Sequence, residues 1–238
     1  MSELGPTLKD PVLPGEGGSD YERYLRTDEL LSLQKTSAEW VHRDELLFQT
    51  VHQSSELWLK LAVEEVAEAT RLSDAGDIGG AVRLLRRAVD CMKIVTDNLD
   101  MLEHLPPWEY MEVRKVLGHG SGFDSPGFRA VHHVMKPLEH ALQGAVEREG
   151  LTFRDLYVRG REHEHLYQLA ELVLEWDERV VMWRARHFVV VERIIGGGVV
   201  GTQGTPVEVL GRLIHSRAFP ELWALRDELT TLAFPTGE

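Results

Sequence analysis

The sequence predicts an all-α fold built from long helices. In one stretch, eight positions follow one another at steps of four and three residues, the spacing of a single helix face: Leu169, Val173, Trp176, Val180, Trp183, His187, Val190 and Ile194. A second seam with the same spacing is wholly apolar and extends from Ala81 to Leu102. Strand signals are nearly absent, because Val189-Val190-Val191 is short and lies inside the helical pattern.

Composition limits the classes of partner. The chain has 238 residues, enough for one substantial core, and a formal net charge of −13. Nucleic acid and anionic membranes would repel such a chain. No apolar run is long enough to span a bilayer. We therefore expect neither nucleic acid nor a membrane as a partner.

The ends and the cysteine content predict domain organisation and location. Residues 1–18 are rich in proline and glycine and lack the apolar core of a signal peptide. The single cysteine, Cys91, has no partner for an intramolecular disulfide, which fits a reducing cytosol. We expect a flexible arm over residues 1–18, one helical domain over residues 19–238, and a cytoplasmic location.

Capping and turn residues predict the first helices. Ser19 or Asp20 can cap a helix that continues to about Gln34 and presents Tyr21, Tyr24 and Leu25 on its non-polar surface. A second helix is predicted from Asp44 to about Leu72, and a third from Ile78 to about His104 after a turn at residues 74–77. Pro106-Pro107 ends the third and begins a short helix over residues 108–117.

The second half begins with a glycine-rich loop over residues 118–124. Ser125-Pro126 then predicts an N-cap followed by proline in the first turn of a helix, which continues over residues 130–143 although Pro137 should kink it. A charged connection over residues 147–161 leads to the long helix, which ends at Gly196-Gly197-Gly198. Two short helices are predicted between Thr205 and Leu232.

Two histidines occupy positions where apolar side chains are expected. His187 lies in the seam of the long helix, and His52 shares one face of the second helix with Phe48 and Leu59. A single histidine of this kind is more often a hydrogen-bonded core residue than a ligand, but two raise the odds of a site. With the hydroxyl-bearing loop Gly201–Thr205 nearby, the pattern indicates a bound metal or haem beside a polar substrate clamp.

Other charged residues have less specific interpretations. Arg129 lies in the first turn of its helix, where an arginine and a helix N-terminus together suit a carboxylate ligand; the alternative is a surface arginine paired with Asp124. His163 and His165 are poor metal ligands, because residues i and i+2 point apart on a helix. The charged residues of the second helix are predicted to form a solvated surface: Glu45, Glu56, Lys60, Glu64, Glu65 and Glu68.

Four segments, in order along the chain, resemble the signatures of the tryptophan 2,3-dioxygenases, haem-dependent enzymes that open the indole ring. Residues 44–48 and 52–58, DELLF and HQSSELW, resemble its D-E-x-L-F and H-Q-x-x-E-L-W. Residues 117–129 are similar to its L-G-x-x-S-G-F-Q-S loop and the arginine that follows. Residues 184–202 match its R-x-R-H, V-x-R-x-I-G and G-T elements, and residues 21–28 match its Y-x-x-Y-L-x-x-D helix.

The resemblance implies a helical bundle that holds haem b between long helices and assembles as a homotetramer. His187 would be the axial ligand of the haem iron, and His52 the distal histidine that hydrogen-bonds the indole N–H. The remaining implied roles are contacts to the amino-acid substrate, made by Phe48, Arg129 and Thr202 and, from a neighbouring subunit, by Tyr21, Tyr24 and Leu25.

The implied activity is insertion of O2, the co-substrate, into the indole ring of L-tryptophan or a substituted tryptophan, with ring opening to an N-formylkynurenine-type product. One alternative is a monooxygenase of the same fold that forms a hydroxylated or oxindole product in secondary metabolism. Another is a helical binding or scaffold protein without turnover. Four positions depart from the family pattern: Asp124 replaces a glutamine, Gln203 a glycine, Thr205 a serine and Phe128 a tyrosine. The link from Gly196 to Gly201 is also one residue longer.

Overall fold

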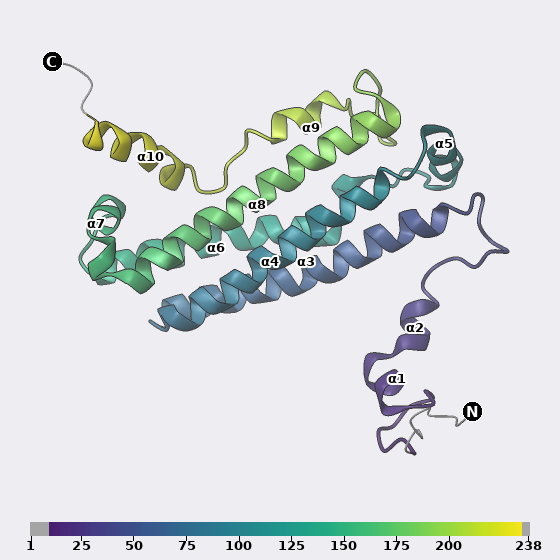
Figure 1. Ribbon diagram of the computed structural model, residues 1–238, viewed down its shortest axis with the longest axis horizontal. Helices are drawn as coiled ribbons and strands as arrows, with labels where there is room; N and C mark the ends of the chain where they lie inside the picture. The colour runs from purple at the N-terminus through teal and green to yellow at the C-terminus, as the bar shows by residue number, and fades with distance from the viewer. Residues whose placement is uncertain (1–9, 235–238) are drawn as a thin grey trace, which may run out of the picture.

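The computed structural model describes residues 10–234, and its centre is a set of four long helices (Figure 1). These helices are α3 (Glu45–Asp74), α4 (Ile78–Leu102), α6 (Pro126–Arg148) and α8 (Glu164–Ile195). Helix α3 packs on α4 and α6, and α8 packs on the same two helices. Because the described residues contain no strand beyond an isolated bridge between Val200 and Pro206, the predicted all-α fold is confirmed.

The shorter helices are α1 (Asp20–Leu25), α2 (Thr27–Leu31), α5 (Pro107–Val116), α7 (Phe153–Val158), α9 (Glu208–Leu213) and α10 (Pro220–Ala233), with 3-10 turns at Gly122–Asp124 and Gly160–Glu162. Four of them, α5, α7, α9 and α10, lie at the ends and along one side of this bundle, whereas the first two stand apart from it (Figure 1). In residues 10–234, no helix has the length and apolar character needed to cross a membrane. Helix α6 passes through Pro137 and ends at Arg148, later than predicted.

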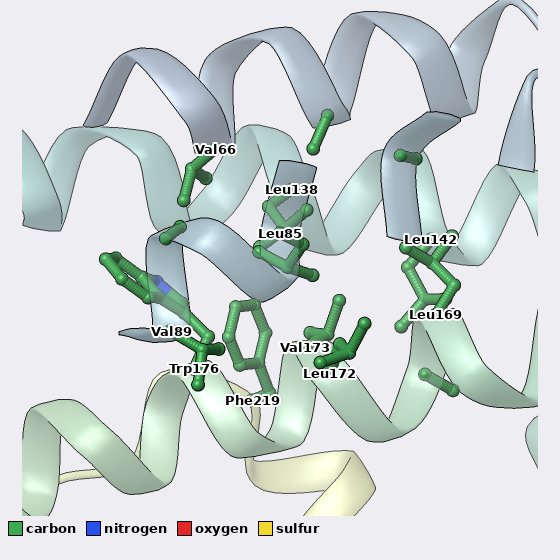
Figure 2. Packing of buried hydrophobic residues seen from close by; sticks show 14 of the residues in the cluster. Val66, Leu85, Val89, Leu138, Leu142, Leu169, Leu172, Val173, Trp176 and Phe219 are labelled. Carbon is green, nitrogen blue, oxygen red and sulfur yellow. The ribbon is translucent and has the colours of Figure 1, made fainter. Parts of the chain in front are cut away.

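The apolar seams meet in one core between the four long helices. Leu85 and Val89 of α4 pack against Val173 and Trp176 of α8, and Leu138 of α6 completes the layer (Figure 2). Each such side chain contributes about 1.5–3 kcal/mol when it is fully buried. The steps of three and four residues therefore identified the inward faces correctly.

A buried carboxylate attaches the C-terminal segment to α8. Asp177 is fully buried, and its Oδ2 accepts hydrogen bonds from the backbone N–H groups of Ala218 (2.9 Å) and Phe219 (3.3 Å) and from the indole N–H of Trp223 (2.9 Å). These donors compensate the loss of hydration of the charge. The contact places Phe219 in the core and fixes the start of α10.

The predicted first helix is two short helices. Ser19 caps α1 as expected, but Arg26 adopts a left-handed conformation (φ 52°) and separates α1 from α2. The helix restarts at Thr27-Asp28-Glu29, because acidic residues are favoured in a first turn. Helices α1 and α2 stand apart from the four-helix bundle (Figure 1). Residues 10–18, the described part of the predicted arm, contact α1 through Asp20 and Arg23, whereas residues 1–9 lie outside the description.

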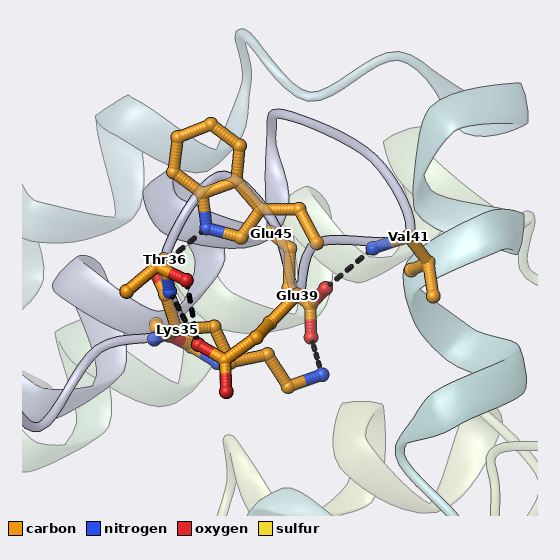
Figure 3. Close-up of polar contacts among 7 residues, drawn as sticks. Lys35, Thr36, Glu39, Val41 and Glu45 are labelled. Atoms are coloured by element: carbon orange, nitrogen blue, oxygen red, sulfur yellow. Dashed lines mark hydrogen bonds and ion pairs between the residues drawn. The ribbon is translucent and has the colours of Figure 1, made fainter.

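Glu45 is not part of a solvated surface, contrary to the prediction. Its side chain is buried, forms an ion pair with Lys35, and accepts a hydrogen bond from the backbone N–H of Val41 at 3.0 Å (Figure 3). In the same connection Glu39 accepts hydrogen bonds from the backbone and hydroxyl of Thr36 (Figure 3). These contacts fold the chain between α2 and α3 back onto the start of α3.

Glu65 is a second exception to the predicted solvated surface. It lies at the interface between α3 and α4, where the guanidinium of Arg87 donates hydrogen bonds to both of its carboxylate oxygens. A paired carboxylate can be buried at a helix contact because the partner compensates its charge. Sequence periodicity does not identify the partner, which is 22 residues away.

Candidate active site

His52 of α3 and His187 of α8 lie at the same end of the bundle, beside α5. A small apolar cluster surrounds them, separate from the main core: Val51, Leu99, Leu102, Val190 and Ile194, with Leu47, Phe48, Tyr110, Trp183 and Ile195 packed against it. Burial lowers the pKa of His52, and burial together with the neighbouring His52 lowers the pKa of His187 to about 4. Both side chains nevertheless keep accessible surface, so a ligand can reach the two neutral imidazoles.

The hydrogen bonding of His52 determines its tautomer. Its Nδ1 lies 2.7 Å from the backbone carbonyl oxygen of Phe48, and a carbonyl only accepts, so Nδ1 carries the proton. Because the ring is neutral, Nε2 is a bare acceptor. The Phe48 ring lies 4.0 Å from the imidazole, centroid to centroid. His52 is therefore prepared to accept a hydrogen bond from an N–H group of a ligand next to an aromatic wall.

Aromatic contacts hold the ring of His187. It stacks on Trp183, with ring centroids 4.8 Å apart and ring planes 9° from parallel. The ring of Trp183 in turn contacts that of Phe128 on α6, with centroids 3.8 Å apart. Among the described residues, no hydrogen bond engages either ring nitrogen of His187. A neutral, oriented imidazole in apolar surroundings is the donor that haem iron takes as an axial ligand. The residues present therefore fit a haem group.

The N-terminus of α6 is attached to α3 by Glu56. Its carboxylate accepts hydrogen bonds from the hydroxyl of Ser125 and from the backbone N–H of Gly127 at 2.9 Å. The predicted cap is confirmed, because Ser125 Oγ also accepts from the N–H of Phe128. The prediction that Glu56 belongs to a solvated surface was wrong, because this carboxylate caps a second helix.

Gly127 permits the close approach of these two helices. A Cβ atom at this position would lie 2.6 Å from Glu56 Oε2 and 2.8 Å from the Cβ of Leu59. Atoms this close must move apart, and forced overpacking of this kind typically costs about 1–3 kcal/mol. The glycine thus allows α3, which carries His52, to hold the turn that carries Phe128 and Arg129.

Arg129 is exposed in the first turn of α6, as predicted. In residues 10–234 its guanidinium forms no ion pair or hydrogen bond with the protein. The alternative pairing with Asp124 does not occur, because the Asp124 carboxylate accepts from the N–H of Ser121 and the side-chain amide of Gln203. The arginine thus remains open to an anionic ligand.

Thr202 lies in a loop that closes onto the glycine-rich loop before α6. Gly196 ends α8 with φ of 88°, a conformation that favours glycine, and the chain turns back. The hydroxyl of Thr202 donates a hydrogen bond to the carbonyl of Gly120. The predicted proximity of the hydroxyl loop to the end of the long helix is confirmed.

Not every predicted site residue joins this group within one chain. Tyr21 and Tyr24 are 68% and 78% exposed on α1, away from the bundle, and Leu25 is also exposed. His163 and His165 lack further ligands, since no group of three or more His, Cys, Asp or Glu residues within the described ranges is placed to hold a metal ion.

Comparison with known proteins decides the family. A family profile described as tryptophan 2,3-dioxygenase matches residues 9–138, which include His52 and Arg129. The tryptophan 2,3-dioxygenase of Caulobacter vibrioides is 37% identical over 88% of this chain and 98% of its own length. The chain belongs to the tryptophan 2,3-dioxygenase family. The relatives of Myxococcus xanthus and Rhodococcus jostii with the same name are each 32% identical, over 95% and 93% of the chain and 97% and 95% of their own lengths.

Two residues that organise the site in this dioxygenase-family chain were missed from sequence. Glu56 lies one turn after His52 and looks like an ordinary exposed glutamate in the helical pattern. Gly127, in the first turn of the predicted helix, was given no role. The available signals were the glutamate in the family's H-Q-x-x-E-L-W signature and a glycine inside the first turn of a helix, where its low helix propensity calls for a packing reason.

Proposed function

We propose that the protein is a haem-dependent tryptophan 2,3-dioxygenase, which inserts both atoms of O2 into the indole ring of L-tryptophan or a substituted tryptophan. The observation that carries this proposal is the pair of neutral histidines on α3 and α8, one with a bare Nε2 acceptor and one stacked on Trp183. The exposed Arg129 and the Thr202 loop would supply groups for both charged ends of an amino acid.

His187 would hold haem b through a ring nitrogen, and the iron would supply the activation of O2, which protein side chains do not perform. The role of this chain is then to bind and orient the substrate. His52 Nε2 accepts a hydrogen bond from the indole N–H, and Phe48 lies against the aromatic ring. The apolar cluster around the two histidines excludes water from the reacting atoms.

The polar groups of the proposed site suit the two ends of an amino acid. Arg129, at the N-terminus of α6, binds the carboxylate with charge-assisted hydrogen bonds. Thr202 has its only hydroxyl proton engaged by the carbonyl of Gly120, so its oxygen is left as an acceptor. An acceptor is complementary to an ammonium group and not to a carboxylate, which assigns Thr202 to the substrate amine.

The exposed residues of α1 are proposed to act in a second subunit. Tyr21, Tyr24 and Leu25 present apolar surface that residues 10–234 of the same chain leave exposed. In a homotetramer they would close the site of a neighbouring copy. We further propose that residues 19–238 form one haem-binding domain, with the arm at residues 1–18, and that the enzyme acts in the cytoplasm.

The reaction is tested by product mass. Reduced, haem-loaded protein is supplied with L-tryptophan and with a ring-methylated tryptophan under oxygen-18. Two labelled oxygen atoms in a ring-opened product would support the dioxygenase. One labelled atom on an intact ring system would contradict it and indicate a monooxygenase, and the better substrate identifies the substituent that the pocket prefers.

Replacement of Arg129 by leucine is expected to weaken substrate binding. The loss of a charge-assisted hydrogen bond costs about 1.5–3 kcal/mol, which raises KM roughly 10- to 150-fold. The measurement is KM for L-tryptophan, with Arg83→Leu on the exposed face of α4 as the matched control. Tryptamine, which lacks the carboxylate, should bind both proteins equally; an unchanged KM for tryptophan in Arg129→Leu would remove this residue from the site.

A further inference from the structure

The loop over residues 199–206 is held to the rest of the protein by polar contacts. Three side chains connect it to α5 and to the loop before α6. The guanidinium of Arg114 donates to the carbonyl of Val200 at 2.8 Å, Thr202 donates to Gly120, and Gln203 donates to the carbonyl of His119 at 3.0 Å. Most of the loop is exposed or only partly buried, so these hydrogen bonds decide whether it stays closed.

Gln203 also links the two loops by a hydrogen bond between two side chains, its own and that of Asp124. Its Nε2 donates to Asp124 Oδ2 at 2.7 Å, and the same oxygen accepts from the backbone N–H of Ser121 at 3.0 Å. Ser121 and Asp124 form a reciprocal capping box around the 3-10 turn Gly122–Asp124. Gln203 therefore donates to a carboxylate that the capping box of the 3-10 turn already holds in place.

Both partners are also positions at which this chain departs from the family pattern. Where the family has glycine, Gln203 supplies a side-chain amide; where the family has glutamine, Asp124 supplies a carboxylate that only accepts. A glycine at position 203 has no side chain with which to make this bond. The side-chain hydrogen bond between the loops thus requires the departure at position 203, and Asp124 makes its acceptor a charged one.

We propose that Asp124 and Gln203 are positioning residues that keep the 199–206 loop closed on the 118–124 loop before the substrate binds. The closed loop fixes Thr202 with its hydroxyl proton on Gly120 and its lone pairs open to the substrate ammonium. Contacts within the chain then offset the entropy lost on ordering the loop before the substrate arrives. This entropy loss therefore does not reduce substrate affinity. This inference rests on the proposed function for the identity of the substrate, but the closure is a property of the chain alone.

The closure is tested by hydrogen–deuterium exchange of the haem-loaded protein without substrate. Inside the loop, the N–H of Gly201 donates to Thr205 and the N–H of Gly204 donates to Gly201, so both amides report on loop order. Gln203→Ala is expected to accelerate their exchange on the order of tenfold, because two hydrogen bonds are lost. The matched control is Gln143→Ala, which removes an exposed glutamine bonded to Glu147 on α6.

A double-mutant cycle separates the pair from its surroundings. Asp124→Ala should accelerate exchange in the same loop. The double variant should accelerate it by less than the two single effects combined, because the bond between Asp124 and Gln203 is lost in both single variants. Asp124→Asn retains an acceptor oxygen, so the exchange rate of its loop should lie between the rates of Asp124→Ala and of the parent. Parental exchange in Gln203→Ala, or additive effects in the double variant, would overturn the proposed closure.

Turnover provides a second readout with a separate outcome. With the loop open, Gln203→Ala must order it at the expense of substrate binding, so KM for L-tryptophan should rise about tenfold while kcat stays near that of the parent. Faster exchange with an unchanged KM would overturn the positioning role. Faster exchange in a protein without turnover of tryptophan would leave the closure established and would instead contradict the proposed function.

Discussion

His187→Ala is expected to abolish stable haem binding while the bundle remains folded. The side chain is the only imidazole in the seam of α8, and it stacks on Trp183 with its pKa lowered to about 4, so it is neutral and able to ligate iron at neutral pH. Its removal leaves haem without the axial bond. The haem content of purified, haem-supplied protein should fall from about one group per chain to near zero.

Two further variants complete this test. His140→Ala, on the exposed surface of α6, should retain full haem content and serves as the matched control. His52→Ala should also retain haem, but turnover should fall about tenfold because the acceptor for the indole N–H is lost. Circular dichroism checks that all variants keep parental helix content. Parental haem content in His187→Ala would show that the assigned ligand is wrong.

Glu56→Ala is expected to destabilise the protein and to impair substrate binding together. Glu56 accepts from Ser125 and Gly127 at the N-terminus of α6, and hydrogen bonds to a charged group contribute about 1.5–3 kcal/mol each. The free energy of unfolding should therefore fall by about 2–4 kcal/mol. Since Arg129 lies in the turn that Glu56 holds, KM for tryptophan should rise as well.

Urea denaturation and steady-state kinetics measure the two effects. Glu64→Ala, an exposed glutamate on the same helix, is the matched control and should change the free energy of unfolding by less than about 0.5 kcal/mol. Glu56→Gln, which retains one acceptor oxygen, should recover part of both losses. If Glu56→Ala matched Glu64→Ala in stability and KM, the contact between α3 and α6 would not position the site.

Helix positions and inward faces were predictable because they depend on local patterns. The bounds of α3, α4, α5 and α8 follow from apolar spacing, proline and glycine, and the Ser125 cap from its place before Pro126. The break at Arg26 was not predictable in this way, because residues 20–31 all fit one continuous helix. The family resemblance added candidate roles that spacing alone does not supply.

The contacts of three glutamates, two of them buried and Glu56 half-buried, show why the rest required the structure. Glu45, Glu56 and Glu65 look alike in the sequence, but each meets a different partner: Lys35, the turn at Ser125–Gly127, and Arg87. The sequence shows that a charged side chain needs either water or a partner. It does not show which distant segment provides the partner.

The sequence alone determined the all-α class, the two histidines among apolar helix positions, and the arginine at a helix start, because each depends on residues a few positions apart. Only the tertiary structure decided that α3 and α8 bring His52 and His187 together, that Glu56 and Gly127 join α3 to α6, and that Gln203 reaches Asp124. These contacts join segments tens of residues apart, and side-chain packing selects them among many alternatives with the same local pattern.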